Sequence, residues 1–433
     1  MSALPNSRLV EPLAGRQRVA LIGQGYVGLT LAMRAVEVGH SVVGFDVDEE
    51  RVKRLAAGEP QIGDIEPARI TAALASGRYL PTSRVDDCAL FEVAVIAVPT
   101  PLREGMPDLS HIESAARSLA PHVRAGSTVI LESTTYPGTT EEMLVPILEL
   151  GSGLAAGVDV SVGYSPERID PGNTTWTLTN TPKVVSGFDD RSLEAVKAFY
   201  DTLVERTVVV ASTKEAELTK LLENTFRHVN VALVNELAMF ADDLDIDVWS
   251  AIDAASTKPF GFMRFEPGPG VGGHCLPIDP TYLAWRAKSR LGRPFRFVEL
   301  ANDVNEHMPD YVVRRLSASF NADRRVLNGS RVLLLGVSYK RNTGDASETP
   351  AVEIARQLHQ MGVDVRAADP HVPPRWADPV LTMVDLTRDE VSSAEAVVVV
   401  TDHDDFDYDL VRKHARYVLD TRHRLDGPRV EQL

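Results

Sequence analysis

The feature that most constrains the fold is a glycine-rich turn between a strand-like and a helix-like segment near the start of the chain. Residues 19–22 form a short apolar run, and a G-x-G-x-x-G turn follows at once over residues 23–28. A helical pattern then runs through Val38, and residues 41–45 are apolar again. This order is that of the βαβ unit of dinucleotide-binding domains, in which the turn brings a helix N-terminus close to a pyrophosphate. The alternative is a βαβ turn that binds no phosphate.

An acidic residue, Asp46, follows the second of these strands, eighteen residues after the third glycine. An acid at this place accepts hydrogen bonds from the adenosine ribose and disfavours a 2′-phosphate, so the sequence predicts NAD rather than NADP. Arg51, five residues further on, tempers this prediction. An arginine beside the ribose can in principle accommodate a 2′-phosphate.

The strand pattern of the first segment recurs near the end of the chain. Three apolar segments correspond in the two halves, namely 331–336 with 18–23, 363–369 with 41–46, and 396–401 with 93–100. We therefore expect an α/β fold with one Rossmann-like domain at each end. The second copy lacks the three-glycine turn, so it is expected to bind another ligand or to bind a dinucleotide differently.

A long helix is expected between the two domains, over residues 212–244. Ser212 and Glu215 have the spacing of a capping box, and leucines recur at helical intervals after them. A helix of roughly 30 residues is about 45 Å long, which is enough to join two domains. Lys220 and Asn224 are one turn apart and share a face. The alternative for this pair is a solvated polar stripe.

Cysteine is rare in this chain, and one of the two cysteines lies in an unusual setting. Cys275 follows a glycine run that starts at Gly268, and Asp279 follows four residues later. This setting favours a nucleophile, and the alternative is a buried, inert thiol in a tight loop. The other cysteine is Cys88, and two cysteines are too few for a disulfide framework. This indicates a reducing compartment and a cytoplasmic protein.

Composition and charge exclude several classes of partner. A net charge of −16 argues against nucleic acid and requires that any phosphate site be built locally. No apolar run approaches the ~20 residues of a membrane span, and residues 1–17 lack the apolar core of a signal peptide. We expect a disordered arm there and no membrane partner. No His, Cys or Asp cluster has metal-ligand spacing, and His274 is interpreted as a loop residue, so no metal is expected.

Further motifs occur in the order found in the nucleotide-sugar 6-dehydrogenases. With the glycine turn and Asp46, the chain resembles this superfamily of UDP-glucose, UDP-N-acetylhexosamine and GDP-mannose dehydrogenases from about Arg18 to Leu425. The motifs are Val98-Pro99-Thr100-Pro101, Ser133-Thr134 with Pro137-Gly138, Ser165-Pro166-Glu167-Arg168, Glu217-Leu-Thr-Lys220-Leu-Leu-Glu-Asn224, Gly272-Gly273-His274-Cys275 with Asp279, Tyr339-Lys340 with Asp345, and Asp420-Thr-Arg422. The forms at 165–173 and around Cys275 are most similar to a bacterial branch that includes UDP-N-acetylhexosamine dehydrogenases.

The resemblance implies a four-electron oxidation of a nucleotide-linked hexose from the C6 alcohol to the uronic acid, with two NAD⁺. UDP-glucose, a UDP-N-acetylhexosamine and dTDP-glucose all remain open as substrates. Cys275 would trap the aldehyde as a thiohemiacetal, which is oxidised to a thioester that water hydrolyses. Lys220 and Asn224 would donate to the developing oxyanions. The resemblance implies that Asp279 orients or deprotonates the water and also holds Lys220 charged. It places Glu167, together with Thr134, near the nicotinamide, where Glu167 would serve the hydrolytic water.

The resemblance also implies the domain organisation and the ligand contacts. The expected domains are a disordered arm at 1–17, an NAD-binding Rossmann domain at 18–211, a central helical dimerisation domain with the Cys275 loop at 212–310, and a sugar-nucleotide-binding Rossmann-like domain at 311–433. In the family the central helix packs against its twin, so a homodimer is expected. The expected NAD contacts are Gly23, Gly25, Tyr26, Val27, Gly28, Asp46, Arg51, Pro99, Thr100 and Thr134. The expected substrate contacts are Glu167, Arg168, Lys220, Asn224, Gly272, Lys340 and Arg422.

Two positions depart from the family pattern, and two other functions compete. Ser347 stands where the family often has an arginine that reaches the cofactor phosphates, which implies weaker cofactor binding or slower turnover. Arg264 lies close to the sequence position of a family arginine that reaches the partner subunit's sugar, in a register that the sequence leaves open.

The competing functions are a single-step NAD-dependent alcohol or hydroxyacid dehydrogenase and a non-catalytic nucleotide-sugar-binding protein.

Overall fold

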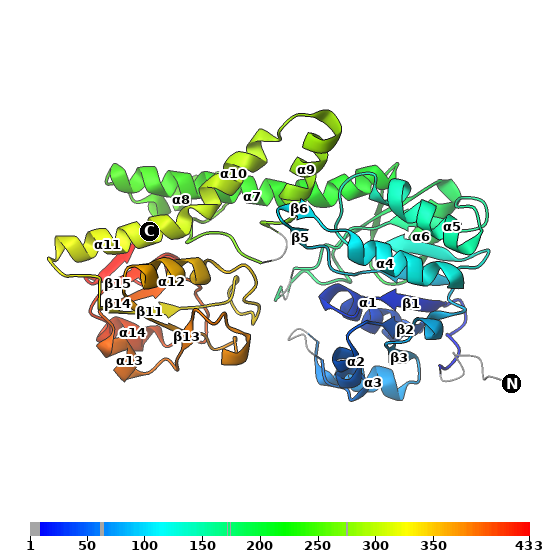
Figure 1. Ribbon diagram of the computed structural model, residues 1–433, viewed down its shortest axis with the longest axis horizontal. Helices are drawn as coiled ribbons and strands as arrows, with labels where there is room; N and C mark the ends of the chain where they lie inside the picture. Colours follow the sequence, from blue (N-terminus) through cyan, green and yellow to red (C-terminus); the bar gives the residue numbers. More distant parts are fainter. Residues whose placement is uncertain (1–8, 61–64, 171, 174, 274–275) are drawn as a thin grey trace. The chain divides into compact units, whose positions relative to one another are not determined.

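The computed structural model describes residues 9–60, 65–170, 172–173, 175–273 and 276–433. The chain divides into two compact units. The first comprises Met1–Glu223 with Thr281–Gly292, and the second comprises Asn224–Pro280 with Arg293–Leu433. The division falls inside one long helix, α7 (Thr213–Asp243), which is drawn in green in Figure 1. The predicted α/β fold, with two Rossmann-like domains joined by a long helix, is confirmed.

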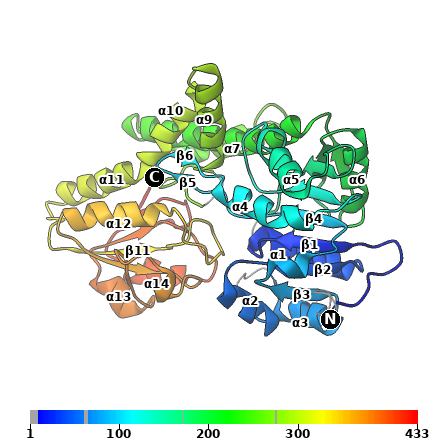
Figure 2. The same cartoon turned by 45° about the vertical axis from the view of Figure 1, so that its right-hand side comes forward.

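Within the described residues the first unit is built on an eight-stranded sheet, with the order β10-β9-β8-β7-β4-β1-β2-β3. Neighbouring strands are parallel except for the antiparallel pair β8 and β9. Figure 2 shows β4, β1, β2 and β3 next to one another in that order. The strands are β1 (Arg18–Ile22), β2 (Ser41–Phe45), β3 (Tyr79–Thr82), β4 (Val93–Ile96), β7 (Thr128–Leu131), β8 (Ser161–Tyr164), β9 (Lys183–Gly187) and β10 (Thr207–Val209).

Helices cover both faces of this sheet, which is why its central strands are apolar on both sides. One face carries Val19 and Leu21, and the opposite face carries Ala20 and Ile22. The first face packs against α1 (Tyr26–Glu37), α2 (Glu49–Ala56), α3 (Pro67–Ala75) and α6 (Asp190–Tyr200). The second packs against α4 (Ser110–Leu119) and α5 (Val145–Ser152). Shorter elements are the hairpin β5 (Leu102–Arg103) and β6 (Met106–Pro107), and helical turns at Val85–Cys88, Ala120–His122 and Thr140–Leu144.

The segment that precedes β1 is held against this unit. Val10 N–H donates to the Gly77 carbonyl (2.9 Å), and Leu13 N–H donates to the Gly39 carbonyl (3.0 Å). Gly39 has φ +98°, and a Cβ there would lie 2.5 Å from the Leu13 side chain. The sequence predicted a disordered arm here, but residues 9–17 are ordered by these contacts and dock against the first unit. Residues 1–8 lie outside the described part of the chain.

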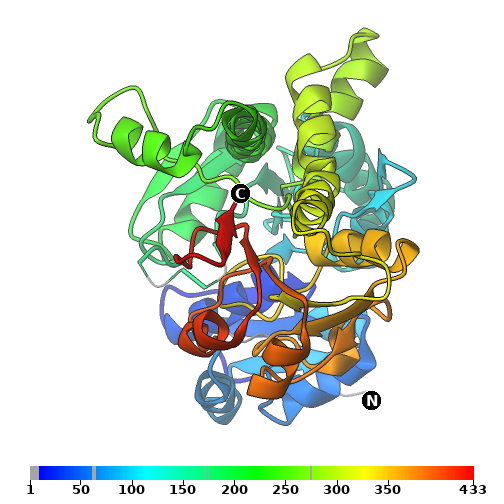
Figure 3. The same cartoon turned by 90° about the vertical axis from the view of Figure 1, so that its left-hand side faces the viewer.

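The second unit contains a parallel sheet with the order β13-β12-β11-β14-β15-β16. Helices α11 and α12 pack on one face of this sheet and α13 and α14 on the other, as the yellow-to-red part of Figure 3 shows. The strands are β11 (Arg331–Leu335), β12 (Asp364–Ala368), β13 (Thr382–Met383), β14 (Ala396–Val399), β15 (Val418–Asp420) and β16 (Val430–Gln432). The helices are α11 (Met308–Ala322), α12 (Pro350–Gln360), α13 (Arg388–Ser393) and α14 (Tyr408–His414), with a helical turn at Pro374–Trp376.

The helix α7 matches the predicted segment 212–244 to within one residue at each end. Its start is capped as predicted, since Glu215 N–H donates to Ser212 Oγ at 3.2 Å. In the second unit α8 (Val248–Ser256) packs on α7 through Val234, Ala238 and Ala241, and α10 (Arg296–Glu306) packs on it at Ala232. The remaining long helix is α9 (Asp279–Leu291). Among the described helices, none combines the length and the apolar character that crossing a membrane requires.

Candidate functional site

The glycine turn lies between β1 and α1, at the carboxyl end of the first sheet. Gly23 has φ +95°, and a Cβ there would lie 2.4 Å from the Ala97 carbonyl oxygen. A Cβ on Gly28 would lie 1.9 Å from the Gly23 oxygen, so both positions require glycine because of the protein's own backbone. Gly25 differs, since no described atom lies within 4 Å of its Cβ position. The turn therefore leaves open space above Gly25, where a pyrophosphate would approach the start of α1.

Asp46 is buried at the end of β2 and binds both the turn and Arg51. Its Oδ2 accepts hydrogen bonds from Gln24 N–H (2.7 Å) and from Arg51 Nη1 (2.9 Å). Its Oδ1 accepts from Asp48 N–H at 3.0 Å. The carboxylate thus fixes the backbone of the turn and neutralises Arg51. This pairing favours the predicted choice of NAD, because the arginine already has a carboxylate partner where a 2′-phosphate would need it.

The predicted contacts after β4 and β7 lie along the same edge of the sheet. Ser133 joins the two strand ends, because its Oγ accepts from Val98 N–H (2.9 Å) and donates to the Val98 carbonyl (2.8 Å). Thr100 is partly exposed, and its carbonyl accepts from Tyr282 Oη at 3.0 Å. Thr134 is also partly exposed, beside the buried Ser133. The remaining predicted cofactor contacts keep some exposure at this edge, and they are Tyr26, Val27 and Pro99.

Glu167 lies in the loop that follows β8, and it is 9% exposed. Its Oε1 accepts a hydrogen bond from Ile169 N–H, while its Oε2 has no hydrogen-bond partner within the described part of the chain. The neighbouring Arg168 donates from Nη2 to Glu223 Oε1 at 2.7 Å and from Nη1 to the Pro182 carbonyl. Arg168 therefore ties this loop to α7, whereas Oε2 of Glu167 is buried and lies 3.9 Å from Lys183 Nζ.

Lys220 and Asn224 lie one turn apart on α7, and each is only 8% exposed. This burial removes the alternative of a solvated polar stripe. Asn224 Nδ2 donates to Asp279 Oδ2 at 2.5 Å, and Asp279 is 3% exposed at the start of α9. Cys275, the predicted nucleophile, lies outside the described residues together with His274. The buried carboxylate of Asp279, which the Asn224 amide contacts, thus lies four residues along the chain from the predicted nucleophile.

The glycine run before Cys275 packs against other parts of the second unit. A Cβ on Gly272 would lie 2.6 Å from the Glu348 oxygen, and one on Gly273 would lie 2.7 Å from the Tyr339 ring. Gly273 N–H also donates to the Ser347 carbonyl at 2.9 Å. These glycines are therefore required by close contact with the 339–348 segment. The same contact places Gly272, a predicted substrate contact, beside the loop that carries Lys340.

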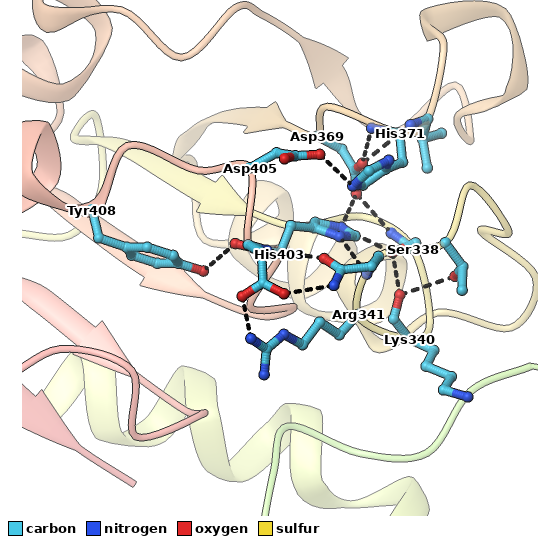
Figure 4. A network of polar contacts seen from close by, with 12 residues as sticks. Ser338, Lys340, Arg341, Asp369, His371, His403, Asp405 and Tyr408 are labelled. Atoms are coloured by element: carbon cyan, nitrogen blue, oxygen red, sulfur yellow. Dashed lines mark hydrogen bonds and ion pairs between the residues drawn. The ribbon is translucent and has the colours of Figure 1, made fainter. Parts of the chain in front are cut away.

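A buried polar network, which Figure 4 shows, binds the backbone of the loop that carries Lys340. His403 has no exposed side chain, its Nδ1 accepts from Asn342 N–H (2.9 Å), and its Nε2 contacts Asp369 Oδ2 (2.9 Å). Because Nδ1 accepts, the ring proton lies on Nε2 and is donated to the carboxylate. Asp369 in turn accepts from Ser338 N–H at 3.0 Å. Although burial alone raises the pKa of Asp369, the contacts with His403 and the backbone amides hold that pKa below its usual value.

Asp369 and Asp46 have matching places in the two sheets. Each follows the second strand of its βαβ unit, and each accepts from the backbone N–H groups of the turn after the first strand. The sequence showed that 363–369 corresponds to 41–46, and that correspondence was the available signal for Asp369. His403 carried no such signal. Its partners lie 34 and 61 residues away along the chain, at Asp369 and Asn342.

Arg422 is partly buried in the second unit and is bonded to the backbone there, so it is not plain surface charge. Burial lowers its pKa below the usual value. Its Nε donates to the Val400 carbonyl at 2.8 Å, and its Nη1 lies 2.5 Å from where a Cβ on Gly268 would be. The guanidinium therefore faces the start of the glycine run. A partly buried arginine at the carboxyl end of a parallel sheet suits an anionic ligand.

The two departures from the family pattern have defined surroundings. Ser347 donates from N–H (2.9 Å) and from Oγ (2.5 Å) to Asp345 Oδ1, so it closes a local turn. Arg264 donates to Asp253 Oδ1 (2.5 Å) and to Glu266 Oε1 (2.9 Å). Both residues are thus engaged within the second unit.

Glu217 is one further residue that sequence reasoning left without a role. It accepts hydrogen bonds from Gly138 N–H (2.5 Å) and Thr140 N–H (2.8 Å). Burial raises the pKa of Glu217 to about 7.

Comparison with known proteins gives matches along nearly the whole chain. Residues 17–204, 214–307 and 333–427 match the NAD binding, central and UDP binding domains of the UDP-glucose/GDP-mannose dehydrogenase family. The UDP-N-acetyl-D-mannosamine dehydrogenase of Pyrococcus horikoshii is 34% identical over 421 residues, which cover 95% of this chain and 97% of that protein. The UDP-N-acetyl-D-glucosamine 6-dehydrogenase of Pseudomonas aeruginosa is 38% identical over 359 residues, covering 82% and 83%.

Solved structures are similar over the same extent. A structure of the P. horikoshii UDP-N-acetylmannosamine enzyme has a TM-score of 0.87 at 33% identity, covering 96% of this chain and 98% of that one. A UDP-glucose dehydrogenase from Pyrobaculum islandicum has a TM-score of 0.88 at 28% identity, covering 98% of both chains. The fold is therefore shared with these proteins along nearly the whole chain.

Proposed function

Because the chain belongs to the UDP-glucose/GDP-mannose dehydrogenase family, we propose that it oxidises the C6 hydroxyl of a nucleotide-linked hexose to the carboxylate with two NAD⁺. The chain is an NAD-dependent nucleotide-sugar dehydrogenase. The observation that supports the four-electron reaction is the burial of Lys220 and Asn224 on one turn of α7, with Asn224 bonded to Asp279 close to Cys275 in the sequence. A non-catalytic binding protein has no need to bury an ammonium and a carboxylate there.

The described residues of the first unit fit NAD. The open space at Gly25 accommodates a pyrophosphate against the start of α1, and Asp46 is placed for the adenosine ribose. When bound, NAD⁺ accepts a hydride at its nicotinamide ring. Thr134 and Glu167, at the carboxyl ends of β7 and β8, would hold the reacting end of the site.

Each residue of the proposed catalytic group has a distinct task. Lys220 and Asn224 would donate hydrogen bonds to the alkoxide and to later tetrahedral oxyanions. The Cys275 thiolate would attack the aldehyde to form a thiohemiacetal, and the thioester formed by the second oxidation would be hydrolysed. The water loses a proton to Glu167 or Asp279, its oxygen bonds to the carbonyl carbon, and the Cys275 sulfur leaves with the electrons of the C–S bond. Lys340 and Arg422 would bind the phosphates or sugar of the substrate.

We infer that the substrate is a UDP-N-acetylhexosamine. Relatives with this substrate type cover most of this chain, and the third domain matches a UDP binding domain. The test is NADH formation with equal concentrations of UDP-N-acetylglucosamine, UDP-N-acetylmannosamine, UDP-glucose and dTDP-glucose. We expect the highest kcat/KM with one of the acetamido sugars. A preference for UDP-glucose or dTDP-glucose would reject this substrate and keep the reaction type.

Replacing Asp46 with alanine is expected to weaken NAD binding and to reduce the preference for NAD over NADP. The change removes an acceptor for the ribose and releases Arg51 to meet a 2′-phosphate. A lost hydrogen bond to a charged group corresponds to a roughly 10- to 100-fold rise in the KM for NAD. KM values for NAD and NADP measure this, with Glu49→Ala, an exposed acid three residues away, as the control. Unchanged values for both cofactors would remove Asp46 from the site.

The chain is proposed to form a homodimer through α7. One face of this helix carries large apolar side chains that are about half exposed, namely Phe226 (47%), Leu233 (52%), Leu237 (48%) and Phe240 (58%). Helix α8 covers another face of α7 and leaves this one open. These residues are separated by seven, four and three positions, which places them on one face of the helix and suits packing against the same helix of a second copy.

Leu237→Glu is expected to convert the dimer into a monomer, because it buries a charge at the centre of the proposed interface. Light scattering at micromolar concentration should give twice the 47.3 kDa chain mass for the wild type and the single chain mass for the variant. Leu150→Glu is the matched control, since Leu150 is 83% exposed on α5. A wild-type monomer would refute the dimer and any contribution of Arg264 to a neighbouring subunit's site.

A further inference from the structure

Three buried polar side chains, His403, Asp369 and Ser338, bind the turn that follows β11 in the second unit. None of the three has exposed side-chain surface. His403 Nδ1 accepts a hydrogen bond from Asn342 N–H at 2.9 Å, so the ring proton lies on Nε2. That nitrogen lies 2.9 Å from Asp369 Oδ2 and 3.0 Å from Ser338 Oγ. Because both contacts use the same nitrogen, this trio is not a hydrolytic triad, in which the serine and the carboxylate bind opposite nitrogens of the histidine.

The trio fixes the backbone on both sides of Lys340. Before Lys340, Ser338 N–H donates to Asp369 Oδ2 at 3.0 Å. After it, Asn342 N–H donates to the His403 ring. At Lys340 itself, the carbonyl accepts a hydrogen bond from Ser338 Oγ at 2.9 Å. The backbone of Lys340 is thus held in place, while its side chain points away from the network, as Figure 4 shows.

This turn differs from the glycine turn of the first unit in how it can bind an anion. In the first unit, Gly25 leaves open space where a pyrophosphate can approach the backbone. The corresponding residue of the second unit is Ser338, whose N–H is already donated to Asp369 and whose side chain is fully buried. Because the backbone of this turn is already engaged, we expect an anionic ligand to be bound by side chains here.

The turn carries two cations, Lys340 and Arg341, and they are held differently. The Arg341 guanidinium pairs with Asp404 and lies 3.6 Å from Asp402, so two carboxylates of the same unit neutralise it. The Lys340 side chain points away from these residues and from the trio (Figure 4). A long side chain loses conformational freedom when it binds a ligand, and a mobile backbone would add to that loss. Fixing the backbone of Lys340 therefore lowers the entropy cost of binding.

We propose that His403 and Asp369 are positioning residues for substrate binding, which act through Lys340 by fixing the backbone of residues 338–342 before the ligand arrives. This inference rests on the proposed function, which makes Lys340 a contact of the substrate phosphates or sugar. The trio thus raises the affinity for the nucleotide sugar. It does not act on NAD binding, which uses residues of the first unit.

The test is a double-mutant cycle between His403 and Lys340, with UDP and UDP-N-acetylglucosamine titrated by calorimetry into the full chain. His403→Gln keeps a donor toward Asp369 and removes the ring acceptor of Asn342 N–H. It should raise the Kd about 3- to 10-fold, the equivalent of ordering one long side chain. Lys340→Met removes the cation and should raise the Kd further. Adding His403→Gln to Lys340→Met should then have little effect, because residues that act through one contact are not additive.

Non-additivity is the signature that a merely structural role does not produce. If His403→Gln raises the Kd by the same factor with and without the lysine, or if either single variant leaves the Kd unchanged, the proposal is wrong. If His403→Gln does not fold, Ser338→Ala takes its place, since it cuts the link between the ring and the Lys340 carbonyl by removing one oxygen. The same non-additivity is expected of it. His359→Gln is the matched control, since His359 is an exposed histidine on α12 of the same unit.

The outcome can be separated from that of the proposed function. NADH formation by the wild type with nucleotide sugars tests the reaction and requires no assumption about His403. Binding of UDP without NADH formation would refute the reaction, and the cycle would still decide on His403. NADH formation together with an additive cycle would refute only the role of His403. Failure of both probes to bind the wild type would refute the proposed substrate and, with it, this inference.

Discussion

Cys275→Ser is expected to abolish formation of the uronic acid while leaving the fold and NAD binding intact. A serine hydroxyl at neutral pH is a far weaker nucleophile than a partly ionised thiol, so the aldehyde is not carried forward to an acyl-enzyme. The expected loss of turnover is at least about 10³-fold, as for other residues that act directly in a covalent step. Product analysis by mass spectrometry, together with the NADH yield, measures the effect.

The second cysteine provides the matched control. Cys88 is 1% exposed in the core of the first unit, and burial raises its pKa to about 12, so it is not a nucleophile at neutral pH. Cys88→Ala is therefore expected to keep the wild-type product. If Cys275→Ser still makes uronic acid at close to the wild-type rate, the thioester route is wrong.

Lys220→Ala is expected to lower kcat by about 10²–10³-fold, with little change in the affinity for NAD. Lys220 is buried on α7 one turn before Asn224, so it can direct its charge at an oxygen that becomes negative in the transition state. Steady-state kinetics and a separate NAD titration measure the two effects. Lys214→Ala is the control, since Lys214 lies in the first turn of the same helix, has a side chain that is 48% exposed, and pairs with Glu141. An unchanged kcat in Lys220→Ala would remove this residue from the catalytic group.

Local sequence patterns predicted the parts of the fold that depend on local interactions. The glycine turn, the two strands around it and both ends of α7 occur where the sequence places them. The reasons are visible in the structure, since Gly23 and Gly28 have no room for a side chain and Ser212 caps the helix. Periodicity and capping act over a few residues, so a single sequence carries them.

Contacts between distant segments could not be predicted in this way. No local pattern near Lys183 predicts its pairing with Glu132, which is 51 residues away in the sequence. The pairing of Arg168 with Glu223 likewise has no local signal. The same holds for His403, whose ring binds two loops of the second unit. The docking of residues 9–17 depends on Gly39 and Gly77, which only the folded sheet brings close. Such pairings are set by sheet order rather than by local pattern.

The central claim is that one site carries out two oxidations of the same sugar carbon, and the ratio of NADH formed to nucleotide sugar consumed tests it most directly. With limiting UDP-N-acetylhexosamine, excess NAD⁺ and the reaction run to completion, we expect two NADH per sugar and a uronic acid as the final product. A ratio of one, with an aldehyde or ketone as the product, would identify a single-step dehydrogenase and contradict the four-electron mechanism.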